Sequence, residues 1–329
     1  MAGERFLVTG GTGCIGSWVV RSLVREDVPV VVPTSGGSLQ RLRLVLTDDE
    51  LERVTVVRGD IADLPGLEAI ARDHDVNRLI HLAGWQFPFC AADPAQGAIV
   101  NVVGTINAFE VAKRLGIERV VYASSAAVYG PKAHYEQAVL DADAPFWPTS
   151  HYGAFKLANE VNARVFWQND GIASVGLRPH SVYGPGRDQG VTSKPTVAMI
   201  AAATNRPYHV NFGGQCQFQY AADAAATYVA AARSELTGAS AFSIGGRITA
   251  VSEIVRVIEE LEPGARGRIT FGEDALAFPE AFDNAPLVEA LGAYRETPLV
   301  DGIAETLETY RGALADGRID AAYLDRVLA

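Results

Sequence analysis

The sequence has few cysteines and no surplus of positive charge. Its 329 residues include three widely separated cysteines, Cys14, Cys90 and Cys216, without a CxxC spacing. Such a set indicates neither a disulfide framework nor a metal site, so we expect no metal. The 28 Lys and Arg residues are outnumbered by 39 Asp and Glu, which gives a net charge of −11. Nucleic acids and anionic membranes are bound by clustered positive charge, so neither is an expected partner.

Long apolar runs are also missing. The chain has no span of about 18 apolar residues that would cross a membrane. Its first residues enter the strand-like run "ERFLVTGG" without the basic and then apolar leader of a secreted protein. We therefore expect a cytoplasmic location. The hydrophobic fraction of 48% is ordinary for a globular enzyme.

What the chain does contain is an alternation of short β-branched runs with longer helical patterns. Strands are expected at 5–9, 28–32, 53–57, 78–83, 119–124 and 172–178, and helices at 14–26, 64–73, 94–115 and around Tyr152. This alternation is typical of βαβ units and of a parallel sheet covered on both faces.

The character of the chain changes after Arg178. The segment "RPHSVYGPGRDQGVTSKP" is rich in Gly and Pro, and later elements are shorter. We predict an α/β fold of the Rossmann type, a doubly wound parallel sheet with a smaller C-terminal substrate lobe. Residues 1–178 and about 221–245 would form the dinucleotide-binding domain, and about 179–220 with 246–329 the lobe. Ligands of such sheets bind beyond the carboxyl ends of the strands.

A glycine-rich turn follows the first expected strand. "VTGGTGCIGSWVV" places Gly10, Gly13 and Gly16 at the opening of a helix, with Cys14 and Ile15 among them. Glycines there allow a tight turn and let backbone N–H groups approach a pyrophosphate at the positive end of the helix. The segment predicts a dinucleotide site.

The second strand ends without the acidic residue that bonds the ribose hydroxyls of NAD. Thr34 and Ser35 stand there, and Arg41 follows within reach of a 2′-phosphate. We therefore favour NADP slightly over NAD, although a solvated helix face explains the arginine as simply. Asp60 and Ile61, in "GDIAD" after the third strand, are expected beside the adenine.

"SHYGAFKLANE" places Tyr152 and Lys156 four residues apart, on one face of the expected helix. A tyrosine with a pKa of about 10 is a poor base at neutral pH, and a neighbouring ammonium favours its phenolate. The pair alone arises often by chance. "VVYASSAAVYG", at the end of the fifth strand, adds Ser125 as a group that could orient a substrate oxygen.

Taken in order, TGGTGxxG, HLAG, NVxGT, SSxxVYG and YxxxK resemble the extended short-chain dehydrogenase/reductases, the NAD-dependent epimerase/dehydratase family, over about residues 5–245. The resemblance implies that Ser125, Tyr152 and Lys156 are catalytic, that Lys156 also holds the nicotinamide ribose, and that Asn101 supports the site. Further implied cofactor contacts are Leu82, Ala83, Gly84, Tyr152 and Pro179. His81 is expected to be structural.

The family's homodimers imply a dimer here, through the helices near 95–113 and 152–168. Phe109, Phe166 and Trp167 are candidates for that interface, and internal packing explains them equally well.

Three departures from the family narrow the reaction. Ala126 and Ala127 stand where dehydratases carry an Asp-Glu pair. Cys216 and Gln217 stand where nucleotide-sugar enzymes carry an arginine for the diphosphate, and Ser181 replaces an asparagine. Without that arginine a diphosphate would be poorly held, unless Arg187 or Lys194 compensates. We therefore expect a small-molecule substrate without a nucleotide.

The substrate pocket is expected to be lined by Trp85, Gln86, Phe87, Ser125, His180, Tyr183, Arg187 and Tyr220. Aromatic surfaces with a few polar groups suit a sugar or another polyol-like carbonyl compound. Arg187 is the candidate anchor for an anionic or hydroxyl-rich end, and pairing with Asp188 is its alternative role.

The sequence thus predicts an NAD(P)-dependent oxidoreductase that transfers hydride to or from a secondary alcohol or ketone of a small sugar-like substrate. One alternative is an NAD(P)-dependent sugar or nucleotide-sugar epimerase, in which the oxidation is transient. Another is a non-catalytic regulator that senses a dinucleotide.

Overall fold

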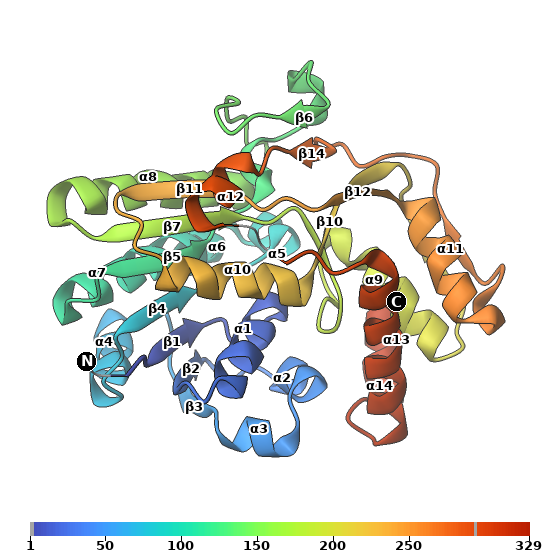
Figure 1. The fold of residues 1–329 in the computed structure, drawn as a ribbon, viewed down its shortest axis with the longest axis horizontal. Helices are drawn as coiled ribbons and strands as arrows, with labels where there is room; N and C mark the ends of the chain where they lie inside the picture. Colours follow the sequence, from blue (N-terminus) through green and yellow to red (C-terminus); the bar gives the residue numbers. More distant parts are fainter. Residues whose placement is uncertain (1–2, 293–294) are drawn as a thin grey trace.

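A seven-stranded parallel sheet forms the centre of the computed structural model, which describes residues 3–292 and 295–329. The strand order is β11-β7-β5-β4-β1-β2-β3 (Figure 1). The strands are β1 (Phe6–Thr9), β2 (Val30–Thr34), β3 (Thr55–Arg58), β4 (Arg78–His81), β5 (Arg119–Ala123), β7 (Ala173–Arg178) and β11 (Ala239–Ser243). They all come from the two segments predicted to bind the dinucleotide, and the predicted Rossmann-type α/β sheet is confirmed.

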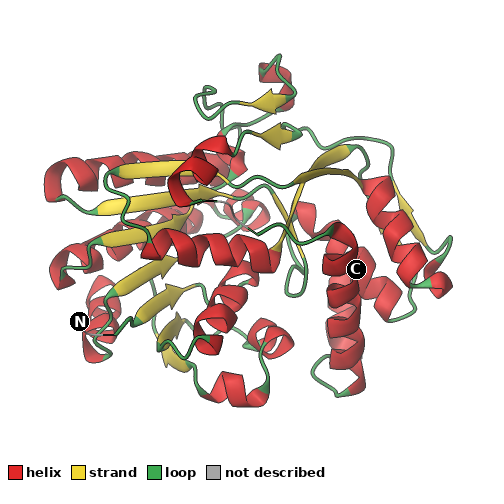
Figure 2. Ribbon diagram, in the orientation of Figure 1, coloured by secondary structure: helices red, strands yellow, loops and turns green. Residues whose placement is uncertain are grey.

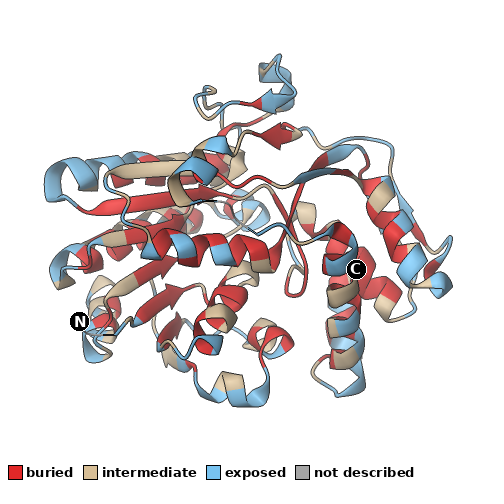
Figure 3. Cartoon of the chain, in the orientation of Figure 1, coloured by how far each residue is buried: buried red, intermediate tan, exposed pale blue. Residues whose placement is uncertain are grey.

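Helices cover both faces of the sheet, because alternate residues of each buried strand point to opposite sides. In β1, Phe6 and Val8 join one apolar cluster and Leu7 joins the other. The first face packs against α1 (Cys14–Arg25) and α10 (Ala221–Arg233), and the second against α4 (Leu64–Asp73), α7 (Gly104–Leu115) and α8 (His151–Asp170). Figure 2 shows the strands between these helices, and Figure 3 shows that the inner strands are buried.

The C-terminal lobe is built on smaller sheets. A three-stranded sheet has the order β12-β10-β8, and the pairs β13-β9 and β14-β6 lie beside it. These strands are β6 (Val139–Leu140), β8 (Ser181–Tyr183), β9 (Tyr208–Val210), β10 (Gln215–Tyr220), β12 (Arg247–Ala250), β13 (Ile269–Phe271) and β14 (Ala281–Phe282). Their helices are α9 (Lys194–Ala203), α11 (Val251–Leu261), α12 (Ala285–Leu291), α13 (Leu299–Ala315) and α14 (Ala321–Leu328). β6 lies in the projection at the top of Figure 1, and β14 lies at the base of this projection.

The helix predicted over 94–115 is divided by a π-helical turn. It consists of α6 (Pro94–Ala98), the π turn η1 (Ile99–Val103) and α7. Its start is set by Asp93, whose side chain accepts a hydrogen bond of 3.0 Å from the Gln96 N–H, with Pro94 in the first turn. Such turns interrupt helices at functional sites, and this one contains Asn101.

Short elements were not predicted. They are the helices α2 (Gln40–Val45), α3 (Asp48–Glu52) and α5 (Phe87–Ala92), and the 3₁₀ turns η2 (Ala126–Val128), η3 (Lys132–His134), η4 (Val191–Ser193) and η5 (Pro263–Ala265). The second strand starts at Val30 rather than at 28, because Asp27 has a φ of 56° and extends the preceding turn. In the part of the chain that the structure describes, no helix has the length and apolar character needed to cross a membrane.

Candidate active site

The glycine turn leaves the first N–H groups of α1 available for an anion. Gly13 is the N-cap residue, and glycine has no side chain with which to bond them. Gly10 has a φ of +70°, and a Cβ there would lie 2.5 Å from the Ala83 nitrogen. A Cβ on Gly16 would meet the carbonyl oxygen of Gly10. The backbone therefore fits the pyrophosphate of a dinucleotide and requires glycine to do so.

A cavity of about 790 Å³ extends from this turn along the carboxyl ends of the central strands and under the C-terminal lobe. The predicted cofactor residues that line it are Gly10, Gly13, Cys14, Ile15, Gly16, Arg41, Leu82, Gly84, Tyr152, Lys156 and Pro179. The predicted substrate residues that line it are Trp85, Gln86, Phe87, Ser125, His180 and Arg187. Segments far apart in the sequence thus meet in one cavity.

Ser125, Tyr152 and Lys156 lie together in this cavity. Ser125 follows β5 and lines the cavity together with Tyr152, which lies in the first turn of α8. That turn is capped by Ser150, whose side chain accepts a hydrogen bond of 3.1 Å from the Gly153 N–H. The Lys156 Nζ lies 5.7 Å from the centre of the Tyr152 ring and donates a hydrogen bond of 2.8 Å to the Ala123 carbonyl oxygen. The arrangement can exchange a proton with a bound oxygen atom.

Burial is the largest influence on the pKa values of Tyr152 and Lys156. Burial raises the pKa of Tyr152, while the neighbouring Ser125 hydroxyl and the charge of Arg187 act in the opposite direction. Burial lowers the pKa of Lys156 to about 8. A pKa of about 8 leaves Lys156 protonated at neutral pH, with its Nζ 5.7 Å from the centre of the Tyr152 ring. That its charge favours the Tyr152 phenolate stays a prediction, and Arg187 acts in the same direction.

Asn101 approaches the site through its side-chain oxygen. Its Nδ2 donates to the Gly97 carbonyl oxygen at 3.0 Å, while Oδ1 is buried without a hydrogen-bond partner among the described residues. A Cβ on Gly84 would lie 2.8 Å from this Oδ1 and 3.3 Å from the Lys156 Nζ. The two polar atoms thus both lie beside Gly84, and an unpartnered amide oxygen next to an ammonium suits a hydroxyl group such as that of a ribose.

His81 has the structural role that the sequence predicts. Its ring nitrogens bond Thr9 at 2.7 Å and Thr105 at 3.1 Å, and Thr105 donates a hydrogen bond of 2.7 Å to the Asn101 carbonyl oxygen. Burial lowers the pKa of His81 to about 3, so the ring is neutral. This buried chain of hydrogen bonds joins the end of β1 to the π turn.

Arg41 is held by a carboxylate. Its Nε and Nη2 donate hydrogen bonds of 3.0 and 2.6 Å to Asp188, which also accepts one of 3.2 Å from the Tyr323 hydroxyl in α14. The expectation of a guanidinium free for a 2′-phosphate is therefore wrong. The sequence suggested Asp188 as an ion-pair partner of Arg187. In the structure Asp188 pairs with Arg41 instead.

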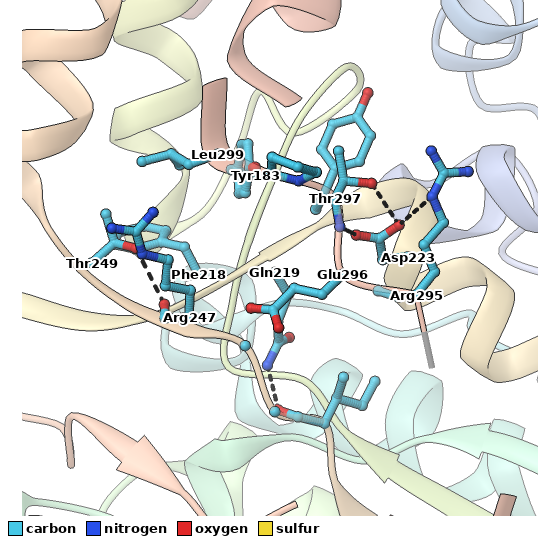
Figure 4. Close-up of a pocket in the computed structure, with 16 residues that line it drawn as sticks. Tyr183, Phe218, Gln219, Asp223, Arg247, Thr249, Arg295, Glu296, Thr297 and Leu299 are labelled. Carbon is cyan, nitrogen blue, oxygen red and sulfur yellow. Dashed lines mark hydrogen bonds and ion pairs between the residues drawn. The ribbon is translucent and has the colours of Figure 1, made fainter. Parts of the chain in front are cut away.

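Tyr183 and Tyr220 do not line the main cavity, and their placement there was wrong. Both are 3% exposed, with ring centroids 5.4 Å apart, and Tyr220 packs edge-on against Trp18 of α1. The side chains of β8 and β10 alternate between faces, which turns these two rings away from the cavity. They line a second cavity of about 500 Å³ instead (Figure 4).

The remaining predicted residues differ in their position relative to the main cavity. Thr34 and Ser35 end β2 and, like Asp60 and Ile61 after β3, lie outside the cavity lining, as does Ala83. Thr34 accepts a hydrogen bond of 3.2 Å from the Gly37 N–H. His180 lines the cavity, but its nitrogens face protein oxygens of Gln217 at 3.2 Å and Pro279 at 2.9 Å.

Two features of the site were missed by the sequence. One feature is the segment 276–278, whose residues Leu276, Ala277 and Phe278 line the cavity. It is held there by a hydrogen bond of 2.8 Å that the Lys132 N–H donates to the Ala277 carbonyl oxygen. Glu160, four residues beyond Lys156, forms a buried ion pair with Arg178. Glu160 could have been found from the sequence, because it lies four residues after Lys156 and so on the same face of the helix. No local sequence pattern predicts that residues 276–278 reach the cavity.

The cavity has few carboxylates among its described lining residues. Ala126 and Ala127 line the cavity, and among the described lining residues Asp188 is the one carboxylate. Lys194 begins α9 and lies over the Tyr208 ring, 5.8 Å from its centre. Within the described ranges, no group of three His, Cys, Asp or Glu side chains could hold a metal ion.

A parallel sheet with a glycine turn beside a Ser, Tyr and Lys cluster defines a dinucleotide-dependent enzyme of the short-chain dehydrogenase/reductase class. Residues 6–245 match the NAD dependent epimerase/dehydratase family, and the chain belongs to this family. The predicted resemblance to the extended short-chain enzymes is confirmed.

Similar proteins agree with this assignment. The chain is 31% identical to a UDP-glucose 4-epimerase from Azospirillum brasilense, over 83% of this chain and 81% of that protein. It is 30% identical to a UDP-glucose 4-epimerase from Mycolicibacterium smegmatis, over 93% of this chain and 98% of that protein. A UDP-glucose 4-epimerase from Thermus thermophilus, solved as a complex with NAD, is 25% identical with a TM-score of 0.80, covering 94% and 100% of the two chains.

Proposed function

We propose that the chain transfers hydride between a nicotinamide cofactor and a secondary alcohol or ketone of a small sugar-like molecule. The observation that carries this proposal is the convergence of Ser125, Tyr152 and Lys156 in the cavity that begins at the glycine turn. A bound nicotinamide would supply the hydride acceptor or donor. The Asn101 Oδ1 and the Lys156 Nζ would hold its ribose, and the N–H groups of α1 its pyrophosphate.

The side chains of the protein would move the proton. Tyr152 would donate its phenolic proton to a ketone oxygen, or accept one from an alcohol, while Ser125 orients that oxygen. A raised pKa keeps Tyr152 protonated at neutral pH, which suits donation. Arg187 would favour the phenolate left behind, and Lys156 would add positive charge when protonated.

The test is turnover of secondary alcohols and sugars by the purified enzyme with NAD or NADP. Tyr152→Phe should lower turnover by about 10²–10⁴-fold with cofactor binding intact. A steady change in nicotinamide absorbance supports a net dehydrogenase or reductase. Unchanged turnover in Tyr152→Phe would contradict the proposal, and cofactor binding without turnover of any compound would support the non-catalytic regulator.

An epimerase is the second candidate, and the relatives named UDP-glucose 4-epimerase favour it. In that case the substrate would be oxidised only transiently, and hydride would return to the opposite face of the same carbon. Isomerisation of a sugar without net absorbance change would identify this reaction.

For the cofactor we infer a slight preference for NADP over NAD. The support is the β2 end, where Thr34 and Ser35 stand without the carboxylate that would repel a 2′-phosphate. Because Arg41 is engaged by Asp188, the phosphate would depend on the hydroxyl and N–H groups of this loop. The cytoplasmic location expected from the sequence stays a prediction.

We also propose a homodimer. Ile99 and Val103 are each 41% exposed on the π turn, and Val161 and Val165 are 43% and 45% exposed on α8, which packs against it. Each pair is four residues apart and shares a helix face. Phe109 is fully buried, 4.9 Å from the Phe166 ring, so both belong to internal packing. Trp167, 38% exposed, stays a candidate for the interface.

A further inference from the structure

One part of the main cavity is lined by large apolar side chains, which we call the apolar lining. It consists of Trp85, Phe87, Phe89, Val191, Leu276 and Phe278. Phe87 is 44% exposed and Phe89 47%, and the Phe89 ring lies 6.1 Å from that of Trp85. Exposed aromatic surface within a cavity is unfavourable in water and marks a place where a ligand binds.

The charges of the cavity do not favour a strongly anionic ligand at these residues. Among the described residues that line it, the cations are Arg41, Lys156 and Arg187. Asp188 neutralises Arg41, and Lys156 is directed to the Ala123 carbonyl oxygen beside Tyr152. Arg187 alone is left for the two negative charges of a nucleoside diphosphate, which arginines commonly hold in pairs of parallel hydrogen bonds.

Two polar side chains of the cavity have atoms without a hydrogen-bond partner among the described residues. The Gln86 Oε1 is buried without a hydrogen-bond partner among the described residues, and so is the Arg187 Nε. A Cβ on Gly190 would lie 2.5 Å from the Gln86 Oε1 and 3.3 Å from the Arg187 Nη2, so the two side chains meet at this loop. They offer one acceptor and one cationic donor, which suits a hydroxylated group.

We propose that the substrate carries an apolar group, aryl or branched alkyl, attached to its hydroxylated reacting part, and that the apolar lining binds this group. The inference rests on the proposed function, since Tyr152 fixes the reacting end. The substrate is then a glycoside-like or aryl-substituted alcohol or ketone rather than a nucleotide sugar. Removal of the Phe87 and Phe89 rings from water favours its binding.

The experiment measures binding without turnover. The Tyr152→Phe enzyme, loaded with oxidised cofactor, is titrated calorimetrically with phenyl and methyl β-D-glucopyranoside, with 1-phenyl-1,2-ethanediol and 1,2-propanediol, and with UDP-glucose. In at least one pair, we expect the phenyl compound to bind on the order of tenfold more tightly than its methyl counterpart. Equal affinities in both pairs, or tighter binding of UDP-glucose than of the phenyl compounds, would overturn the inference.

Substitutions then locate the effect. Phe87→Ser with Phe89→Ser should abolish the preference for the phenyl compound and leave the affinity of the methyl compound unchanged. Phe271→Ser removes a ring that is 41% exposed on β13, outside the cavity lining, and should preserve the preference. Cofactor affinity and melting temperature identify a variant that has failed to fold.

A second copy of the chain is the competing occupant of these aromatic rings. If it covers them, the double variant changes the oligomeric mass in sedimentation and the probe affinities stay as they were, which would overturn the inference. The binding assay also separates this inference from the proposed function. Wild-type enzyme that oxidises none of the compounds contradicts the function, while the phenyl preference in Tyr152→Phe still supports the apolar lining.

Discussion

Arg178 donates two hydrogen bonds of 2.7 Å to Glu160, one to each carboxylate oxygen, and the two side chains are 6% and 3% exposed. Ser124 donates to the same carboxylate at 2.5 Å, and the Arg178 Nη1 donates to the Tyr129 hydroxyl at 2.9 Å. The network ties α8, which carries Tyr152 and Lys156, to β7 and to the end of β5. It therefore supports the helix from which the proposed catalytic side chains project.

Removing one charge of this pair leaves the other buried and uncompensated. We expect Glu160→Gln to lower the free energy of unfolding by about 3–5 kcal/mol. Urea denaturation measures the loss. Glu260→Gln is the matched control, because its ion pair with Arg256 is 2.6 Å long but more than half exposed and should contribute under about 0.5 kcal/mol. Equal losses in the two variants would contradict the structural role of the buried pair.

The lowered pKa of Lys156 has a consequence for stability. Burial moves this pKa from 10.5 to about 8. Between these values the unfolded chain still binds a proton that the folded chain has released, so the free energy of unfolding rises with pH through this interval. Below pH 8 both states hold the proton, and the folded state bears the full cost of the buried charge.

We expect Lys156→Met to remove this rise in the free energy of unfolding with pH. The rise is at most about 1.4 kcal/mol per pH unit. Denaturation of both proteins at several values between pH 8 and 10.5 measures it, and groups that titrate in both cancel in the difference. Parallel pH profiles for the two proteins would show that the pKa of Lys156 is not lowered.

A methyl group at Gly16 should disrupt the dinucleotide turn. Its Cβ would meet the carbonyl oxygen of Gly10, so the turn must shift and the N–H groups of α1 lose their alignment. We expect Gly16→Ala to weaken cofactor binding by at least about tenfold and to cost about 1–3 kcal/mol of stability. Fluorescence titration and denaturation measure the two effects. At Gly264 a Cβ meets open space, and Gly264→Ala should leave both quantities unchanged.

A carboxylate at the end of β2 should reverse the inferred cofactor preference. Ser35 is exposed at this end, and Ser35→Asp would place a negative charge where a 2′-phosphate is expected. We expect NADP to bind about tenfold more weakly while NAD is little affected, because like charges repel. Dissociation constants for both cofactors test this. Ser35→Asn is the uncharged control, and an equal effect of both substitutions on NADP would contradict the proposed position of the phosphate.

Charges on the exposed apolar face of α8 should dissociate the proposed dimer. Val161→Glu with Val165→Glu places two carboxylates on a surface that would be buried between copies. We expect monomers in sedimentation equilibrium, with the fold retained by circular dichroism. Val288→Glu, at a position on α12 that is 37% exposed, should leave the dimer intact. A wild-type protein that is already monomeric would contradict the proposal outright.

Local patterns were sufficient for the parallel sheet and the glycine turn. The β-branched runs marked the first six strands of the central sheet in chain order, and the need for glycine at the positive φ of Gly10 made the turn recognisable from sequence. The C-terminal lobe was harder, because its strands of two to six residues pair with partners far along the chain. β6 pairs with β14 across about 140 residues, and no periodicity in either strand indicates this.

The predicted site divides in the same way. Ser125, Tyr152 and Lys156 follow from motif spacing and converge in the structure. Tyr183 and Tyr220 were assigned to the wrong cavity because the face on which a strand residue lies depends on the register of the strand. The sequence alone did not determine this register. Arg41 was misread because its partner, Asp188, lies 147 positions away. Whether such an arginine forms an ion pair depends on residues that are distant in the sequence. The residues near Arg41 in the sequence do not indicate this partner.

The π turn at Ile99–Val103 makes the long helix before β5 sensitive to length. A turn of this kind holds one residue more than an α-helical turn, and each helical residue advances by about 100°. Asn101 reaches Gly84 and Lys156 from one side of this turn, while Phe109 enters the core beyond it. Deleting a single amino acid here would therefore yield a regular α-helix and rotate either Asn101 or Phe109 away from its present position. This part of the chain should tolerate substitutions better than insertions or deletions.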